Sequence, residues 1–330
     1  MKTNSLCIIF LLISSYVFSQ TRSFEFLNLP GNATLSALGG INVSSANQNV
    51  NFFIANPALA RDTTNGWGSA TYLFYFANIG MANFSYQHNF EKVGTLSFGV
   101  QHLAYGQIQG YDQTGVATGK FNSGESALFI GKSHRIHNFR IGVNMKGAFS
   151  NVAGYRANAI LIDLGGIFIH PRQDLSVGLA IKNLGFVLTE YSETSTTKLP
   201  FDLQAGVSFK PEHMPLRFSF TAHHLTSRYI SYYNPNDGSE KPNILDKALR
   251  HFNFGAEVLV HKNVNLLVGY NFLKHKELKL ENSGAGSGLS LGVLTRVKSM
   301  EMAVSRTAYV TGGSYQVSLS ANIEKIVTSR

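Results

Sequence analysis

The sequence predicts an all-β protein, a transmembrane antiparallel β-barrel of about 14 strands with an N-terminal plug segment inside the lumen. Three observations predict it. Apolar and polar residues alternate along many long segments, and the long connections between these segments fall on one side. In addition, one irregular segment precedes the first strand and has no place in the wall.

Period-two alternation recurs from Gly68 onward, as in residues 139–150, 201–210 and 314–323. Each of these segments has one apolar face and one polar or small face, which suits a strand between lipid and a polar lumen. A water-exposed β-sandwich is the alternative fold. Globular strands have about 5–6 residues, so the greater length of these segments favours the membrane barrel. The expected strands are 68–76, 80–90, 93–103, 124–134, 137–150, 157–169, 174–183, 201–210, 215–225, 250–260, 264–272, 287–298, 300–308 and 314–323.

The connections between the expected strands differ in length by side. The long ones are residues 104–123, 184–200, 226–249 and 273–286, and each follows an odd-numbered strand. Outer-membrane barrels of Gram-negative cells have short periplasmic turns and longer extracellular loops. We therefore expect the long loops to be extracellular and both termini to be periplasmic.

The first residues predict an export signal. Lys2 is followed by an uncharged apolar run from Leu6 to Phe18, too short to span a membrane, and a cleavage site is expected after Ser19. Removal of residues 1–19 would also remove Cys7, the only cysteine. The mature chain would then have no disulfide, no cysteine metal site and no thiol nucleophile.

Composition limits the partners of the exported chain. Charged residues make up 14% of the sequence, and the net charge of +9 falls by one to +8 when Lys2 is lost. A basic surface suits anionic membrane lipid or lipopolysaccharide. No basic patch interleaved with aromatic residues is present, so no nucleic-acid partner is expected.

The segment Leu35–Arg61 keeps neither a helix nor a strand period and is rich in small residues and asparagine. A fourteen-stranded barrel is too wide to be filled by its own side chains, and irregular backbone at membrane depth must be buried in protein. We therefore predict a plug at residues 20–67 and a barrel at residues 68–330. The predicted plug motif is Gly39, Gly40, Asn56, Pro57 and Ala58.

Few residues suggest chemistry. The pair His223–His224 resembles a metal motif, but adjacent strand residues point to opposite faces and cannot bind one ion without a bulge. Asp163, Glu257 and Lys146 fall on polar faces and are expected to form ion pairs in the lumen. No catalytic triad or phosphate-binding loop is found. We expect no catalytic residues, no metal and no cofactor.

An aromatic patch lies in the longest connection, where Tyr229, Tyr232 and Tyr233 precede a turn-forming stretch. Two interpretations stay open. The patch is either a contact loop for a protein partner or an extension of the interfacial aromatic girdle.

A series of short motifs carries a family resemblance. With its Asn56-Pro57-Ala58 ending, the plug resembles the hatch of FadL-like outer-membrane proteins. The chain is most similar to the PorV/PorQ family of the type IX secretion system, and to its PorQ branch. The residues behind this resemblance are Phe26–Pro30, Ala37–Gly40, Asn56–Leu59, Asp174–Leu179, Lys182–Gly185, Leu199–Leu203 and Phe218–Leu225.

The resemblance implies a non-enzymatic barrel component of an attachment complex at the cell surface. Its implied protein partners are PorZ, PorU and PorV, which process secreted cargo and attach it to lipopolysaccharide. The alternative is a FadL-like transporter of hydrophobic small molecules, which needs an apolar pocket above the plug. The residues expected to line such a pocket are Leu128, Ile130, Leu161, Ile167 and Leu259.

Overall fold

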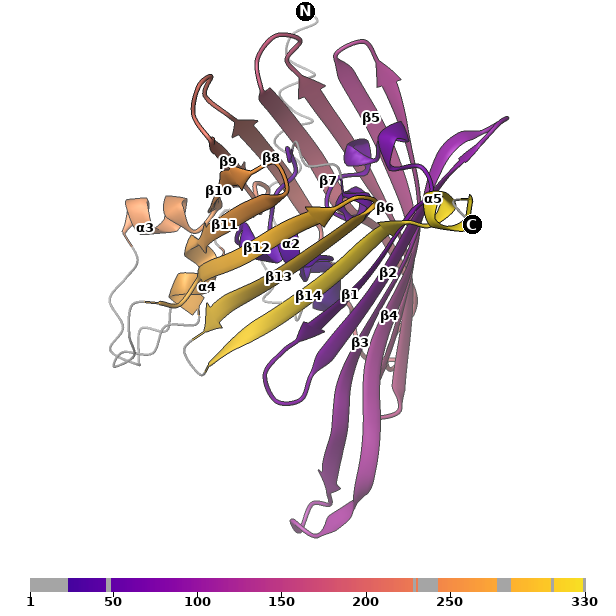
Figure 1. Cartoon of the computed structure of the whole chain (residues 1–330). Helices are drawn as coiled ribbons and strands as arrows, with labels where there is room; N and C mark the ends of the chain where they lie inside the picture. The colour runs from indigo at the N-terminus through magenta and orange to yellow at the C-terminus, as the bar shows by residue number, and fades with distance from the viewer. Residues whose placement is uncertain are drawn as a thin grey trace, which may run out of the picture.

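The computed structural model describes residues 23–45, 49–227, 230, 243–277, 286–309 and 312–328. Its strands form one closed antiparallel barrel in which each strand pairs with its sequence neighbours and β1 pairs with β14 (Figure 1). The predicted closed barrel of fourteen strands is confirmed, and the β-sandwich alternative is excluded. The predicted signal peptide lies outside the described residues.

The strands are β1 (Trp67–Phe74), β2 (Gly80–Phe90), β3 (Gly94–Tyr111), β4 (Ala117–Ile136), β5 (Phe139–Val152), β6 (Tyr155–Ile169), β7 (Leu175–Thr189), β8 (Asp202–Phe209), β9 (Leu216–Ala222), β10 (Phe252–His261), β11 (Val264–Asn271), β12 (Leu289–Val297), β13 (Met300–Tyr309) and β14 (Gly312–Asn322). Short helices precede the strands or lie between and after them: η1 (Glu25–Asn28), α2 (Ala33–Ala37), η2 (Val50–Ile54), η3 (Pro57–Leu59), η4 (Asp62–Thr64), α3 (Ile244–Leu249), α4 (Phe272–Glu277) and α5 (Ile323–Thr328). None of the helices in the described part of the chain is long and apolar enough to cross a bilayer.

The wall is apolar outside and polar inside. Exposed outward side chains include Phe84, Met145 and Leu291, whereas inward positions such as Ser85 and Asn144 are buried. We call the end with the β2–β3, β4–β5 and β6–β7 turns the short-turn end, and the opposite end the long-loop end. Exposed aromatic residues occur toward both ends, as in the girdles of membrane barrels; they are Phe90 and Phe139 at the short-turn end and Tyr72 and Phe74 at the long-loop end.

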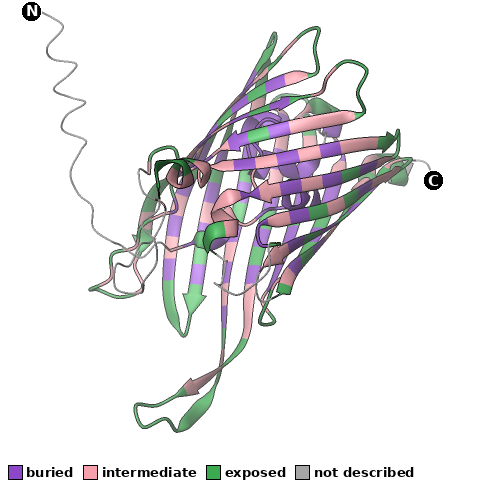
Figure 2. Cartoon of the chain, turned by 90° about the vertical axis from the view of Figure 1, so that its left-hand side faces the viewer, coloured by how far each residue is buried: buried purple, intermediate pink, exposed green. Residues whose placement is uncertain are grey.

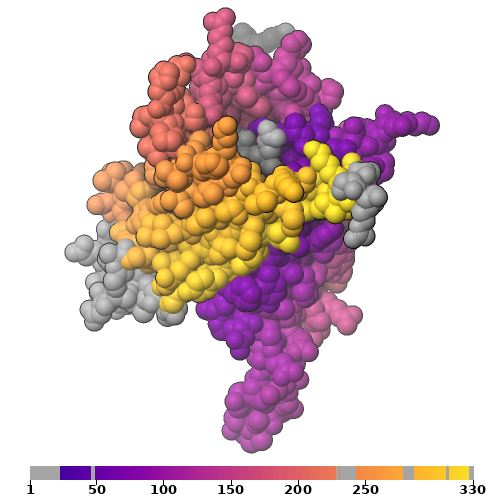
Figure 3. Space-filling model, viewed as in Figure 1, coloured from indigo at the N-terminus to yellow at the C-terminus, as the bar shows by residue number. Residues whose placement is uncertain are grey.

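The strands β3 and β4 continue far beyond their predicted ends. Residues 105–123, expected to be a loop, form most of a two-stranded arm (the β3–β4 arm) that stands clear of the barrel (Figures 1 and 3). The ladder shifts register between Ala104 and Gln107, and Gly106 has φ of +76°. Such a bulge interrupts the two-residue period, so alternation does not reveal the continuing strands.

The barrel wall is uneven in height. The strands β3 to β7 have 14 to 20 residues and form what we call the tall wall. The strands β8 to β12 have 7 to 10 residues and form the short wall. A tilted strand needs about 9–11 residues to span a bilayer, so parts of the short wall barely reach across one.

Candidate functional site

The N-terminal segment passes through the lumen from one end to the other. The Ser23 amide donates a hydrogen bond to the Lys198 carbonyl (3.0 Å) at the long-loop end, and the Gly66 amide donates to Gln87 (2.8 Å) at the short-turn end. Figure 2 shows its buried coils inside the ring of strands. Since α5 lies at the short-turn end, the described chain begins and ends at opposite ends of the barrel. The sequence had led us to expect both termini at the same end.

Asparagine side chains begin three of the helices in this segment. Asn32 Oδ1 accepts a hydrogen bond from the Leu35 amide (2.7 Å), and Asn49 Oδ1 accepts one from the Asn51 amide (2.9 Å). Asn56 does the same at the start of η3. Asparagine is among the preferred N-cap residues. A series of capped turns, each too short to repeat, explains why the sequence of this segment has no period.

Gly39 and Gly40 lie where the segment meets the short wall. Their φ angles are +91° and +94°, which favour glycine. Asn253 on β10 donates hydrogen bonds to the carbonyls of Leu38 (2.8 Å) and Ile41 (2.7 Å). A Cβ atom on Gly39 would collide with the Asn253 side chain, so both the conformation and the space require glycine there.

The Asn56-Pro57-Ala58 motif lies against the tall wall. Asn56 is fully buried, and its Nδ2 donates to the carbonyl of Val43 (2.8 Å) and, at longer range, to that of Gly166 on β6 (3.3 Å). Its Oδ1 accepts from the Ala58 amide (3.0 Å). One side chain therefore joins two parts of the segment to the wall.

Inward-facing glycines receive the segment on most strands. A Cβ atom built on any of them would meet an atom of the segment within about van der Waals distance, and several would collide with its backbone. We call them the plug-facing glycines. Sequence reasoning missed them, although most of them occupy polar-face positions of the expected strands. They are Gly99, Gly131, Gly142, Gly165, Gly178, Gly206, Gly255, Gly269 and Gly292.

Polar wall side chains hold the backbone of the segment. Asn144 on β5 donates to the Phe53 carbonyl (2.7 Å), and Ser176 on β7 donates to the Ser44 carbonyl (2.6 Å). Irregular backbone in the lumen is thus satisfied by protein, as a membrane-spanning fold requires. Further wall residues that donate to backbone carbonyls of the segment are Gln101, Ser133, Arg140, Asn271 and Gln316.

Two ion pairs join charged side chains in the lumen. Lys146 Nζ lies 2.6 Å from Asp163 Oδ1, and both side chains are buried. The Asn183 amide also donates to that carboxylate oxygen (2.8 Å). Glu257 lies 3.3 Å from an Arg217 nitrogen. Buried pairs of this kind orient the wall but contribute little net stability.

A packed apolar cluster, which we call the apolar chamber, lies in the long-loop half of the lumen beside the tall wall and is filled by the segment. Phe24, Phe26 and Leu27 of the segment belong to one buried cluster with inward wall residues. The rim of the cluster is made of half-buried side chains, among them Tyr75 and Tyr105. The larger inward wall residues of the chamber are Leu73, Met81, Leu103, Phe129 and Leu161.

The predicted pocket lining is partly wrong. Leu161 and Ile167 are buried inside, but Leu128 and Ile130 are 51% and 54% exposed on the outer face. In β4 the odd-numbered residues, such as Phe129, point inward. Leu259 lines a cavity of about 780 Å³ at the short-turn end, away from the chamber.

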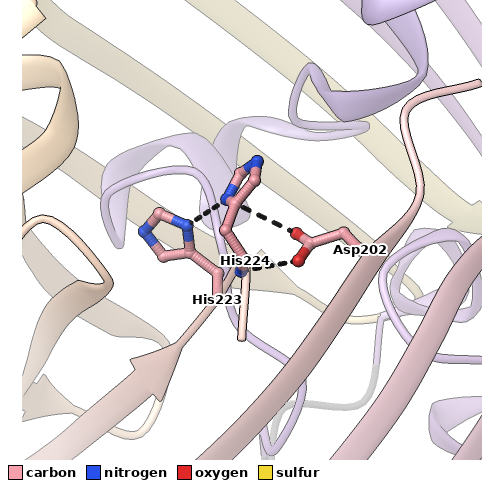
Figure 4. A group of neighbouring side chains, drawn as sticks. All are labelled: Asp202, His223 and His224. Carbon is pink, nitrogen blue, oxygen red and sulfur yellow. Dashed lines mark hydrogen bonds and ion pairs between the residues drawn. The ribbon is translucent and has the colours of Figure 1, made fainter. Parts of the chain in front are cut away.

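The two adjacent histidines do not behave as strand neighbours. His223 follows the last residue of β9, and His224 has a φ of +55°, which turns its side chain to the same side as His223 (Figure 4). The two Nδ1 atoms lie 2.6 Å apart. The His224 amide donates to Asp202 Oδ1 (2.6 Å), and Asp202 Oδ2 is 3.8 Å from His224 Nδ1. Asp202 and His223 are buried, so the cluster faces the lumen.

The predicted partner-contact residues Tyr229, Tyr232 and Tyr233 lie outside the described residues. Their role as a docking patch or girdle extension stays a prediction.

Comparisons with known proteins identify the fold. No family model matches the chain, and no curated protein matches its sequence. A solved structure of a mutant of the TodX monoaromatic hydrocarbon channel is similar over 89% of this chain and 98% of that chain, with a TM-score of 0.53 and 14% identity. The KdgM porin covers 77% of this chain and 98% of its own, with a TM-score of 0.36 and 9% identity. The likeness to the TodX mutant shows that the chain has the fold of outer-membrane β-barrels.

Proposed function

We propose that this protein is an outer-membrane channel for small apolar molecules, closed by its own N-terminal segment. The apolar chamber carries the proposal. The interior of membrane barrels is usually polar, yet inward Leu, Met and Phe side chains meet here on neighbouring strands. The likeness to a barrel named as a monoaromatic hydrocarbon channel supports the same function.

The segment itself supplies the apolar groups that a solute would replace. Phe24 and Phe26 are 1% and 2% exposed within the chamber. Burying a phenyl side chain contributes roughly 1.5–3 kcal/mol, and an aromatic solute of similar area gains a comparable amount. The free energy of replacing a phenyl side chain by an aromatic solute is therefore close to zero. This suits a site that must both bind and release the solute.

Binding of toluene to the purified full chain in detergent tests the proposal. Phe26→Ala opens space in the chamber and is expected to tighten toluene binding about tenfold, equivalent to about 1.4 kcal/mol. Phe84→Ala is the matched control, since Phe84 is 51% exposed on the outer face. The channel proposal fails if neither wild type nor Phe26→Ala binds toluene, or if the control binds as tightly as Phe26→Ala.

A second function, a membrane anchor for surface proteins, is favoured by the β3–β4 arm. The arm exposes Ile108, Tyr111 and Val116, which are 37%, 66% and 62% accessible. Exposed apolar patches mark interaction surfaces. In this proposal the arm docks partners of a type IX attachment complex, with PorZ, PorU and PorV as the expected proteins and the long-loop end outside the cell.

Deletion of residues 107–120 tests the anchor. The barrel is expected to stay folded, with retained heat-modifiable migration, while surface proteins that co-purify from native membranes are lost. Trimming residues 192–196 of the β7–β8 connection serves as the control. Unchanged co-purification after the arm deletion would exclude docking by the arm without affecting the channel proposal.

A further inference from the structure

Asp202, His223 and His224 combine the three features of a transition-metal site: suitable ligand atoms, proximity and burial. Their ligand atoms lie within 4.8 Å of one another, and two of the three residues are buried. We propose that these residues bind a divalent first-row transition ion, such as Zn²⁺, in the wall of the barrel. Two imidazole nitrogens and one carboxylate oxygen form a common ligand set for such ions.

The ligand atoms need only small shifts to reach coordination distance. Two ligands about 2.0–2.1 Å from a tetrahedral ion lie about 3.3 Å apart. The observed separations of 2.6 Å between the Nδ1 atoms and 3.8 Å between His224 Nδ1 and Asp202 Oδ2 lie on either side of that value. Each of the two separations differs from that value by less than 1 Å.

Hydrogen bonds hold the Asp202 carboxylate and the backbone of His223 in place. Gln204 Nε2 donates to Asp202 Oδ2 (2.6 Å), and the His224 amide donates to Asp202 Oδ1. The backbone of His223 pairs with that of His251 before β10, where its amide donates to the His251 carbonyl (2.8 Å). Hydrogen bonds that orient metal ligands are typical of such sites.

The backbone of His224 is the decisive feature. Continued strand geometry would point His223 and His224 to opposite faces. Instead, the left-handed conformation of His224, uncommon for a residue with a side chain, turns both imidazoles to one side. This conformation is what allows two adjacent histidines to share one ion.

Space for a further ligand lies beside the cluster. A cavity of about 40 Å³ is lined by Asp202, His224, Gly40 and Lys182, among others. One water molecule needs about 10–15 Å³ of such space, so a water or a small anion can complete the coordination. The ammonium group of Lys182 favours the anion.

The site would join the two strands of the shortest ladder in the described barrel, the β8–β9 seam. The β8–β9 ladder pairs only Ala205 to Phe209 with Ala222 to Phe218, and β9 has just 7 residues. Asp202 begins β8, and the histidines follow β9, so the three ligands lie beyond the end of this ladder. A bound ion would join the two strands where backbone pairing stops.

Zn²⁺ binding to the purified full chain tests the site. After EDTA treatment and dialysis, calorimetric titration with ZnCl₂ is expected to show one ion bound per chain. A thermal scan is expected to show a higher unfolding temperature with ZnCl₂, because a ligand that binds the folded state stabilises that state. His224→Gly suits the left-handed backbone and should fold. It is expected to weaken Zn²⁺ binding by more than about 100-fold, beyond the loss caused by removing a residue that only orients a metal ligand.

His102→Ala is the matched control, because His102 is exposed on β3 outside the cluster, and it should bind Zn²⁺ as wild type does. Asp202→Asn gives an independent test of the third ligand. The site is refuted if wild type takes up no stoichiometric Zn²⁺, or if His224→Gly and Asp202→Asn bind it like wild type. This outcome does not depend on toluene binding and leaves the channel proposal untouched.

Discussion

The tall wall and the short wall are built from the same pattern but are held differently. In the tall wall, strands of 14 to 20 residues support the β3–β4 arm and line much of the apolar chamber. In the short wall, strands of 7 to 10 residues hold the Asp202–His223–His224 cluster and, together with β13, α2 of the segment. We infer that the short wall depends more on contacts with the segment in the lumen, because the ladders between its own strands are short.

The plug-facing glycines offer the largest test of this difference. An alanine Cβ at Gly269 on β11 would collide with the backbone of Gly39, whereas at Gly165 on β6 it would first meet the Asn56 side chain. We expect Gly269→Ala to lower the free energy of unfolding by about 3 kcal/mol or more and Gly165→Ala by about 1–3 kcal/mol. Urea unfolding in lipid vesicles measures both.

Gly166→Ala is the control for this pair, because a Cβ atom there meets no atom within 4 Å. It should leave the unfolding curve unchanged. Equal losses at Gly269 and Gly165 would show that the segment supports both walls alike.

Two asparagines test the polar contacts in the same way. Asn253 in the short wall donates to two carbonyls of the segment, and Asn144 in the tall wall donates to one. Each buried carbonyl left unpaired costs about 1–3 kcal/mol. Asn253→Ala should therefore destabilise the protein about twice as much as Asn144→Ala, as measured by urea unfolding.

Asn122→Ala on the exposed arm is the reference change and should stay within about 0.5 kcal/mol of wild type. If Asn144→Ala costs more than Asn253→Ala, the polar contacts of the segment matter more to the tall wall, contrary to our comparison.

Sequence periodicity predicted the walls well because each strand separates lipid from a polar lumen at every second residue. It failed where local backbone breaks that period. Because of the bulge at Gly106, the strands of the arm were not predicted. Because His224 has a left-handed backbone, the prediction that the adjacent histidines face opposite sides was wrong. The pairing of each plug-facing glycine with a particular part of the segment depends on three-dimensional packing, which no local pattern encodes.

A third test cross-links the β8–β9 seam. Val207 and Phe220 are directly paired and outward-facing, and the predicted mature chain has no cysteine of its own. A disulfide between Val207→Cys and Phe220→Cys should slow unfolding about tenfold or more if the barrel opens first at this seam, because an early-broken contact governs the unfolding rate.

The equivalent pair in the tall wall, Val143→Cys with Leu164→Cys between β5 and β6, is the control. Both disulfides close short loops in the unfolded chain, so a difference between their unfolding rates reports on the folded wall. Heat-modifiable migration measured over time gives both unfolding rates. If the two disulfides slow unfolding equally, the barrel opens first at another place.

The smallest expected effect is at the tip of the β3–β4 arm, where order is local. Asp112 Oδ1 accepts hydrogen bonds from the Thr114 hydroxyl (2.7 Å) and the Val116 amide (2.9 Å), and these bonds lower the pKa of Asp112. A lowered pKa means that the turn is stabilised above the usual aspartate pKa of about 3.9 and loses that support as pH falls through the lower, folded value.

Asp112→Ala should therefore speed hydrogen exchange of the Val116 amide several-fold while barrel unfolding stays unchanged. Asp112→Asn keeps an acceptor oxygen but cannot titrate, so its exchange should be intermediate and should not change its protection as the pH is lowered. Unchanged exchange at Val116 in Asp112→Ala would mean that the arm is ordered by the tall wall beneath it. The tall wall would then also stabilise the tip of the arm, which the anchor proposal assigns to partner binding.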